Sequence, residues 1–138
     1  MITRLAKGIP WLTLAQAFCL ARVATAVFFM AHAVGRIVLW TIPQFAQFME
    51  GVGFPAGLAW VWLITIVELL AGLALIFRRW VRWAAGFLFV IVFGGIVLIH
   101  ARLGWFVGEH GTGGSEYSVA LIVLLILIAA DDAQQNTP

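Results

Sequence analysis

Charged residues are scarce in this chain, and that scarcity indicates its class. Of the 138 residues, 10% are Asp, Glu, Lys or Arg, whereas 64% are apolar, and the mean hydropathy is +1.07. A soluble domain carries roughly 25–35% charged residues on its surface. The composition therefore predicts an all-α integral membrane protein embedded in the lipid bilayer. The net charge of +2 is too small and too dispersed to indicate a nucleic-acid partner.

Cysteine is nearly absent, which excludes several kinds of redox chemistry. The single cysteine, Cys19, lies in an apolar run, so the chain alone can form neither a disulfide nor a CxxC pair. Two histidines on different helices could ligate haem, but no CxxCH motif attaches one. A metal site built from His32, His100 and a carboxylate is possible, but the sequence supports it no better than a haem site. We therefore expect neither haem nor a metal centre.

Long apolar runs define the expected architecture. A membrane-spanning helix needs about 20 predominantly apolar residues. We expect a single transmembrane domain over residues 1–138, with helices at about 12–34, 56–77, 83–101 and 115–130 and a frayed polar tail at 131–138. Short connections favour an up-down-up-down four-helix bundle. The first run is long enough to span, so we interpret it as an uncleaved helix rather than a signal peptide.

The distribution of basic residues predicts the orientation. Cytoplasmic segments carry an excess of Lys and Arg. The five on one side of the expected bundle are Arg4, Lys7, Arg78, Arg79 and Arg82, and the two on the other are Arg36 and Arg102. Both termini are therefore expected in the cytoplasm.

Two opposite charges, Arg22 and Glu68, each stand alone in an apolar run. A charge at the bilayer centre costs about 2.5–3.5 kcal/mol on insertion scales, so such residues face the bundle interior and find partners. At about 1.5 Å per residue, Arg22 lies roughly 16 Å from Trp11 and Glu68 roughly 15 Å from Arg78. We expect the two charges to share a layer and to pair, either as a structural lock or as a ligand or proton site.

A second polar layer is expected nearer the outer face. The same depth counting places four residues in it: His32, His100, Glu116 and Tyr117. Imidazoles at a membrane boundary suit proton exchange with water. Arg36 shares a helix face with His32, and for Arg36 we favour snorkelling to the interface or helix capping. His110, in the polar loop between the third and fourth runs, is expected to be solvated.

A series of short motifs extends from about Leu20 to Ala130. They are Arg22, Phe28-Phe29-Met30-Ala31-His32 with Gly35, Gly53-Phe54-Pro55, Glu68 with Ala71-Gly72, His100, Gly104-Trp105-Phe106 and Gly113-Gly114-Ser115-Glu116-Tyr117. In order and spacing they resemble the DoxX family of small four-helix membrane proteins. The chain departs from many relatives in having Arg36 where lysine is expected. The missing cysteine pair sets it apart from related thiol-redox membrane proteins.

The resemblance implies an inner (plasma) membrane protein associated with a quinol oxidase or a thiosulfate:quinone oxidoreductase. Our leading hypothesis is a multi-pass protein that binds a quinone or similar lipophilic molecule and works with a partner redox subunit or as a homo-oligomer. The candidate ligand-binding residues are Arg22, His32, Arg36, Glu68, His100, Trp105, Glu116 and Tyr117. If the chain is an enzyme, the candidates for proton transfer are Glu68, His100 and Glu116.

Two other classes of function stay open. The chain could be a scaffold or assembly subunit of a larger membrane complex, with Gly86, Gly94 and Gly95 packing against partner helices. It could also be a small proton-coupled exporter that uses Glu68, although a neighbouring Arg22 would hinder proton and substrate exchange at that carboxylate.

Overall fold

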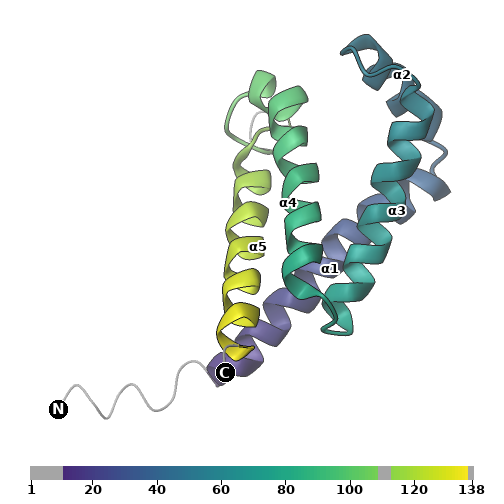
Figure 1. Ribbon diagram of the computed structural model, residues 1–138. Coiled ribbons are helices and arrows are strands. Elements are labelled where there is room, and N and C mark those ends of the chain that lie inside the picture. Colours follow the sequence, from purple (N-terminus) through teal and green to yellow (C-terminus); the bar gives the residue numbers. More distant parts are fainter. Residues whose placement is uncertain (1–10, 109–112, 137–138) are drawn as a thin grey trace.

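The computed structural model describes residues 11–108 and 113–136, and every regular element in them is helical (Figure 1). The elements are α1 (Leu14–Val38), α2 (Ile42–Gly51), α3 (Gly57–Ile76), α4 (Val81–Leu98), the 3-10 helix η2 (His100–Leu103) and α5 (Glu116–Gln135). Three of these, α1, α3 and α4, are long and apolar enough to cross a membrane. The expected all-helical class and multi-pass character are thus supported.

The four longer helices contact one another in a closed order. α1 packs against α3 and α5, α3 packs against α4, and α4 packs against α5. Figure 1 shows α1 crossing the molecule obliquely, whereas α4 and α5 lie side by side along their length. The main core cluster lies where α3, α4 and α5 meet, and α1 adds Ala26 and Phe29 to it.

The N-terminus of α1 is defined by its own sequence. The hydroxyl of Thr13 accepts a hydrogen bond from the Gln16 amide, and the Gln16 side chain accepts one from the Thr13 amide. This capping box satisfies two amides that a helix start leaves free. α1 then runs for 25 residues to Val38, four residues beyond its predicted end at residue 34.

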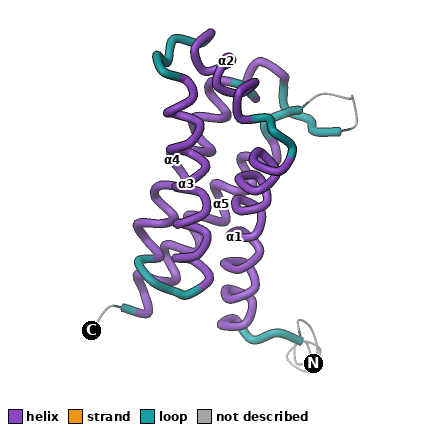
Figure 2. The backbone as a smooth tube through the Cα atoms, turned by 90° about the vertical axis from the view of Figure 1, so that its right-hand side faces the viewer, coloured by secondary structure: helices purple, strands orange, loops and turns teal. Residues whose placement is uncertain are grey.

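α2 is a helix that the search for apolar runs did not predict. It is only ten residues long, too short to span a membrane, and it packs on α3. Its buried residues Ile42, Ala46 and Met49 recur at helical spacing and meet Val61 of α3 in a second core cluster. Figure 2 shows α2 at one end of the molecule, at the opposite end from the described part of the C-terminal tail.

The predicted limits of the last two helices also need correction. α4 ends at Leu98, and residues 100–103 form the tighter η2 rather than its last turn. α5 continues to Gln135, through residues that we expected to be a frayed tail. Asp132 pairs with Arg82 of α4 at 3.6 Å, and Gln135 donates to Asp131 at 2.7 Å. These contacts stabilise the helix through the polar residues that follow the apolar run.

Candidate functional site

A buried ion pair joins the last turn of α1 to the middle of α3. Nη2 of Arg36 donates to Oε2 of Glu68 at 2.5 Å, and Nη1 of the same guanidinium donates to Oγ1 of Thr65 at 2.8 Å. Thr65 in turn donates its hydroxyl proton to the carbonyl of Val61, at 2.7 Å. Both terminal nitrogens of Arg36 are therefore held by α3, which fixes the plane of the guanidinium.

The two side chains of the ion pair are largely buried. The side chain of Glu68 is 4% exposed and that of Arg36 is 15% exposed. Phe45 of α2 places its ring 5.7 Å from the guanidinium carbon of Arg36, within the range of a cation–π contact. In the part of the chain that the structure describes, no hydrogen bond reaches the second oxygen of Glu68, Oε1.

The expected pairing of Arg22 with Glu68 is wrong, because Arg36 is the partner of Glu68. Gly72 of α3 lies against Met30 and Ala26 of α1. Glu68 is one helical turn before Gly72, so it faces the part of α1 beyond Met30, whereas Arg22 lies a turn before Ala26. Depth counting from the two ends failed because α1 begins well beyond the level at which α3 ends: Gly72, four residues before that end, already lies against Met30 and Ala26.

Arg36 also differs from its expected role. It does not extend to the interface, since its guanidinium turns inward to Thr65 and Glu68. The long, flexible side chain lets a residue near a helix end place its charge well away from its own Cα. Thr65 and Phe45 were not predicted as residues of the site. Thr65 gave a weak signal as a polar residue three positions before Glu68, and nothing in the sequence marked Phe45.

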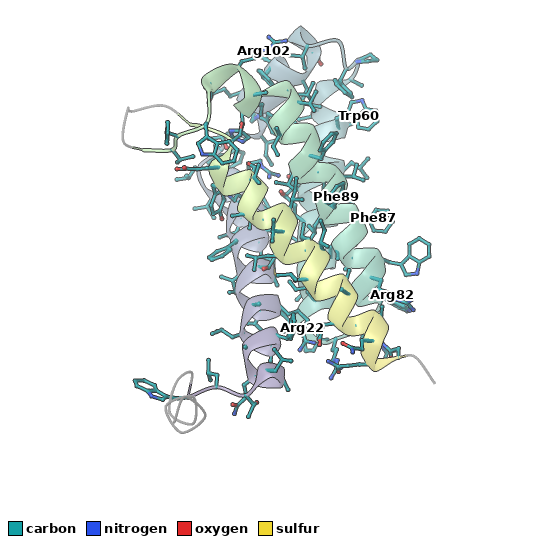
Figure 3. All side chains as sticks on the ribbon, turned by 90° about the vertical axis from the view of Figure 1, so that its left-hand side faces the viewer. Arg22, Trp60, Arg82, Phe87, Phe89 and Arg102 are labelled. Carbon is teal, nitrogen blue, oxygen red and sulfur yellow. The ribbon has the colours of Figure 1, made fainter. Side chains whose placement is uncertain are left out.

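Arg22 nevertheless lies on the inner side of its helix. Figure 3 shows it on the side of α1 that is turned toward the other helices. Its Nε and the hydroxyl of the fully buried Thr25 are both buried without a hydrogen-bond partner in the described chain. The contact of Nη2 with Sγ of Cys19, at 3.8 Å, is a weak one.

Two histidines of the expected outer layer lie in electrostatic range of each other. His32, an exposed residue of α1, is in that range of both Arg36 and His100. The ring of His100 lies against Gly95, where an added methyl group would be 3.9 Å from Cδ2. Nδ1 of His100 is buried and has no hydrogen-bond partner among the described residues.

The other expected members of this layer serve different contacts. Glu116 accepts a hydrogen bond from the Val107 amide at 2.8 Å, and its own amide donates to the Trp105 carbonyl at 3.1 Å. Glu116 thus fastens the segment after η2 to the start of α5. Tyr117 packs edge-on against Phe28 of α1, with ring centroids 6.3 Å apart. Trp105 is 53% exposed, and His110 lies outside the described residues.

No group of three or more His, Cys, Asp or Glu side chains within residues 11–108 and 113–136 is placed to hold a metal ion. The site therefore consists of the Arg36–Glu68 ion pair between α1 and α3, with His32 in electrostatic range of Arg36 and of His100. It offers a guanidinium, a carboxylate with a free oxygen, and two imidazoles.

These features define a small multi-pass helical membrane protein with an ion pair buried between two of its helices. The model of the DoxX family matches residues 17–101, which contain the ion pair, His32 and His100. Because the match covers more than half of the chain, the protein belongs to the DoxX family, and the resemblance noted from its motifs is confirmed. A comparison with curated proteins found no match, and neither did a comparison with solved structures.

Proposed function

We propose that this DoxX family protein binds a quinone, or a lipophilic molecule with similar carbonyl groups, between the Arg36–Glu68 ion pair and His100. The observation that carries the proposal is the buried Nδ1 of His100, which has no partner in the described chain. A buried polar atom of this kind costs about 1–3 kcal/mol unless a ligand or water satisfies it. A quinone carbonyl is a suitable acceptor when Nδ1 carries the proton.

The neighbouring groups supply the proton chemistry that such a ligand needs. Reduction of a quinone to a quinol takes up electrons and protons in equal number. An imidazole can donate a proton at one nitrogen and accept one at the other, and His100 and His32 provide two such rings. The free oxygen of Glu68 can receive a proton while Arg36 holds the other oxygen.

The electrons are proposed to come from a partner redox subunit. One chain has a single cysteine and so cannot provide a dithiol. A partner of this kind places the protein within a membrane oxidoreductase system, as the family resemblance implies. An exporter that uses Glu68 is less well supported, because its carboxylate must be free to exchange protons and substrate, whereas Glu68 is bound to Arg36.

Quinone content tests the proposal directly. The protein is purified in mild detergent, its lipophilic contents are extracted, and the quinone per chain is counted by chromatography. We expect near-stoichiometric quinone that falls sharply in His100→Ala and in Glu68→Gln. The matched control is Arg102→Gln, an exposed position in η2. Well-folded protein without quinone would overturn the proposal, as would unchanged quinone in both site variants.

We also propose that α5 is the fourth span of an up-down-up-down bundle with both termini in the cytoplasm. Its 20 residues extend for roughly 30 Å, about the thickness of the hydrocarbon core. The contact of Asp132 with Arg82 ties its C-terminal end to the arginine-rich turn between α3 and α4. An excess of arginine favours the cytoplasmic side of the inner membrane. A C-terminal fluorescent-protein fusion should then fluoresce, and an alkaline phosphatase fusion should be inactive.

A scaffold role is the second candidate, and one observation favours it. Methyl groups added to Gly86 and Gly94 of α4 would meet nothing within 4 Å, so a partner helix could approach closely there. Gly95 differs, because His100 lies next to it. If the chain is a scaffold alone, replacing Glu68 and His100 together should leave the assembly of its partner complex intact.

A further inference from the structure

A groove of about 620 Å³ lies between α3 and α4, at the end next to the turn that connects them. Its walls are almost entirely apolar and include Leu70, Ala74 and Phe77 of the α3 side and Trp83 and Phe87 of α4. Four of these five side chains are exposed, and Ala74 is half-buried. α3 and α4 are both long and apolar enough to cross a membrane, so in a bilayer this exposed groove would face the hydrocarbon.

A second, polar hollow of about 310 Å³ adjoins this groove at the turn. The two hollows share Arg79, Trp80 and Trp83 in their linings, so they lie next to each other on either side of these side chains. Arg78 and Arg82 line the polar hollow, with Asp132 and Asn136 opposite them. Together the hollows form an amphipathic site, which we call the turn groove: an apolar channel with a cationic mouth.

The charge at the mouth is only partly compensated. Arg82 pairs with Asp132 at 3.6 Å. Arg79 places its guanidinium 5.7 Å from the ring of Trp80, which holds the charge at the mouth without neutralising it. Within the described residues, neither Arg78 nor Arg79 has a carboxylate partner. The mouth therefore keeps an excess of positive charge.

The turn itself is held in an unfavourable backbone conformation. Arg78 has φ of 56° and Trp80 has φ of 52°, in the left-handed region that residues with a side chain seldom adopt. Strain of this kind persists where the surrounding structure enforces it, and it gathers at functional sites. Here it fixes the segment that carries both Arg79 and Trp80, the two residues at the junction of the hollows.

We propose that the turn groove binds an anionic phospholipid, with one acyl chain along the apolar walls and the phosphate at Arg78 and Arg79. Tryptophan side chains favour the headgroup level of a membrane, and Trp80 and Trp83 line the mouth. Basic pockets between membrane helices are suited to anionic headgroups. This site is separate from the Arg36–Glu68 site, so it does not depend on the proposed quinone binding.

A partner helix or a free quinone fits the observations less well. Either could cover the apolar walls, but a quinone carries no anion for the two unpaired arginines, and a partner helix would need an acidic side chain placed at the mouth. An anionic lipid satisfies both halves of the turn groove, because one molecule carries an acyl chain for the apolar walls and a phosphate for the arginines.

Native mass spectrometry of the full chain in detergent tests this proposal with phosphatidylglycerol as the probe and phosphatidylcholine as the zwitterionic comparison. We expect preferential binding of phosphatidylglycerol, weakened about fivefold for each arginine removed in Arg78→Gln and Arg79→Gln. Ala74→Phe should also reduce binding by filling the groove while leaving the arginines in place. The matched control, Arg102→Gln, should bind like the unmodified protein.

Three outcomes would overturn the proposal. The first is equal binding of phosphatidylcholine, which would remove the role of charge. The second is displacement of the lipid by glycerol phosphate at equal concentration, which would show a headgroup site without a role for the apolar channel. The third is unchanged binding in Arg78→Gln and Arg79→Gln, whose exposed side chains make both variants suitable even if Ala74→Phe fails to fold.

Discussion

Arg36 and Glu68, 32 residues apart in the chain, meet at 2.5 Å across the interface of α1 and α3. Removing one partner of a buried pair leaves the other charge without compensation, at a cost of about 3–5 kcal/mol. We therefore expect Arg36→Met to lower the thermal stability of the protein in detergent strongly. The double variant Arg36→Met/Glu68→Leu should recover most of the loss, because no buried charge remains.

Thermal unfolding followed by circular dichroism measures both variants, with Arg102→Met as the exposed arginine control. Equal destabilisation in the single and double variants would contradict this account and would assign the loss to packing instead. Quinone content should be low in both variants, since the proposed site has lost Arg36 in each. The single and double variants should therefore differ in thermal stability but not in quinone content, which distinguishes the two effects.

Arg22 should behave in the opposite way to Arg36. Its buried Nε has no partner in the described chain, and an unsatisfied buried polar group costs about 1–3 kcal/mol. Arg22→Met keeps a side chain of similar length but removes the unpaired polar group, so we expect unchanged or raised thermal stability. A loss as large as that of Arg36→Met would show that Arg22 has a partner in the purified protein.

The sequence was sufficient to predict the helices that are apolar throughout. Runs of apolar residues determine where a spanning helix can form almost without regard to its neighbours, so the runs that hold Arg22 and Glu68 both became helices. α2 escaped this search because its signal is periodic rather than continuous. A search at helical spacing would have found Ile42, Ala46 and Met49.

Side-chain partners could be predicted less well than helices. The choice between Arg22 and Arg36 as the partner of Glu68 depends on how far α1 is shifted along α3 and on how far an arginine side chain reaches. Neither is encoded in residue spacing along one helix. Counting depth also placed His32 and His100 in one layer, and His100 lies in electrostatic range of His32. It did not anticipate that Glu116 would bind a backbone amide.

Glycines at three positions should respond very differently to alanine. A methyl group on Gly57 would lie 2.1 Å from the Ala46 carbonyl oxygen, which is backbone and cannot yield. Gly57→Ala should therefore push α2 away from α3 and lower thermal stability. Gly86→Ala meets nothing within 4 Å and should raise helix stability by about 0.5–1 kcal/mol. Similar melting temperatures for these two variants would contradict the close packing of α2 on α3.

Gly72 is an intermediate case, because its neighbour is a flexible side chain. The added methyl group would lie 2.4 Å from Cγ of Met30, and methionine can adjust its rotamers. We expect Gly72→Ala to destabilise the protein less than Gly57→Ala. Shortening the neighbour in Gly72→Ala/Met30→Ala should recover part of that loss in thermal unfolding. No recovery would indicate that the helix backbones, rather than Met30, set the separation.

The amide of Val107 reports on how Glu116 fastens the segment after η2. This amide donates to Oε1 of Glu116 at 2.8 Å, so its hydrogen exchange should be slow. Glu116→Ala removes the acceptor, and exchange at Val107 should accelerate, as measured by hydrogen–deuterium exchange in detergent. Glu116→Gln keeps a carbonyl oxygen at the same place and should preserve most of the protection. Asp131→Asn, at the far end of α5, serves as the control. Equal exchange in all three variants would mean that the hydrogen bond does not order this segment.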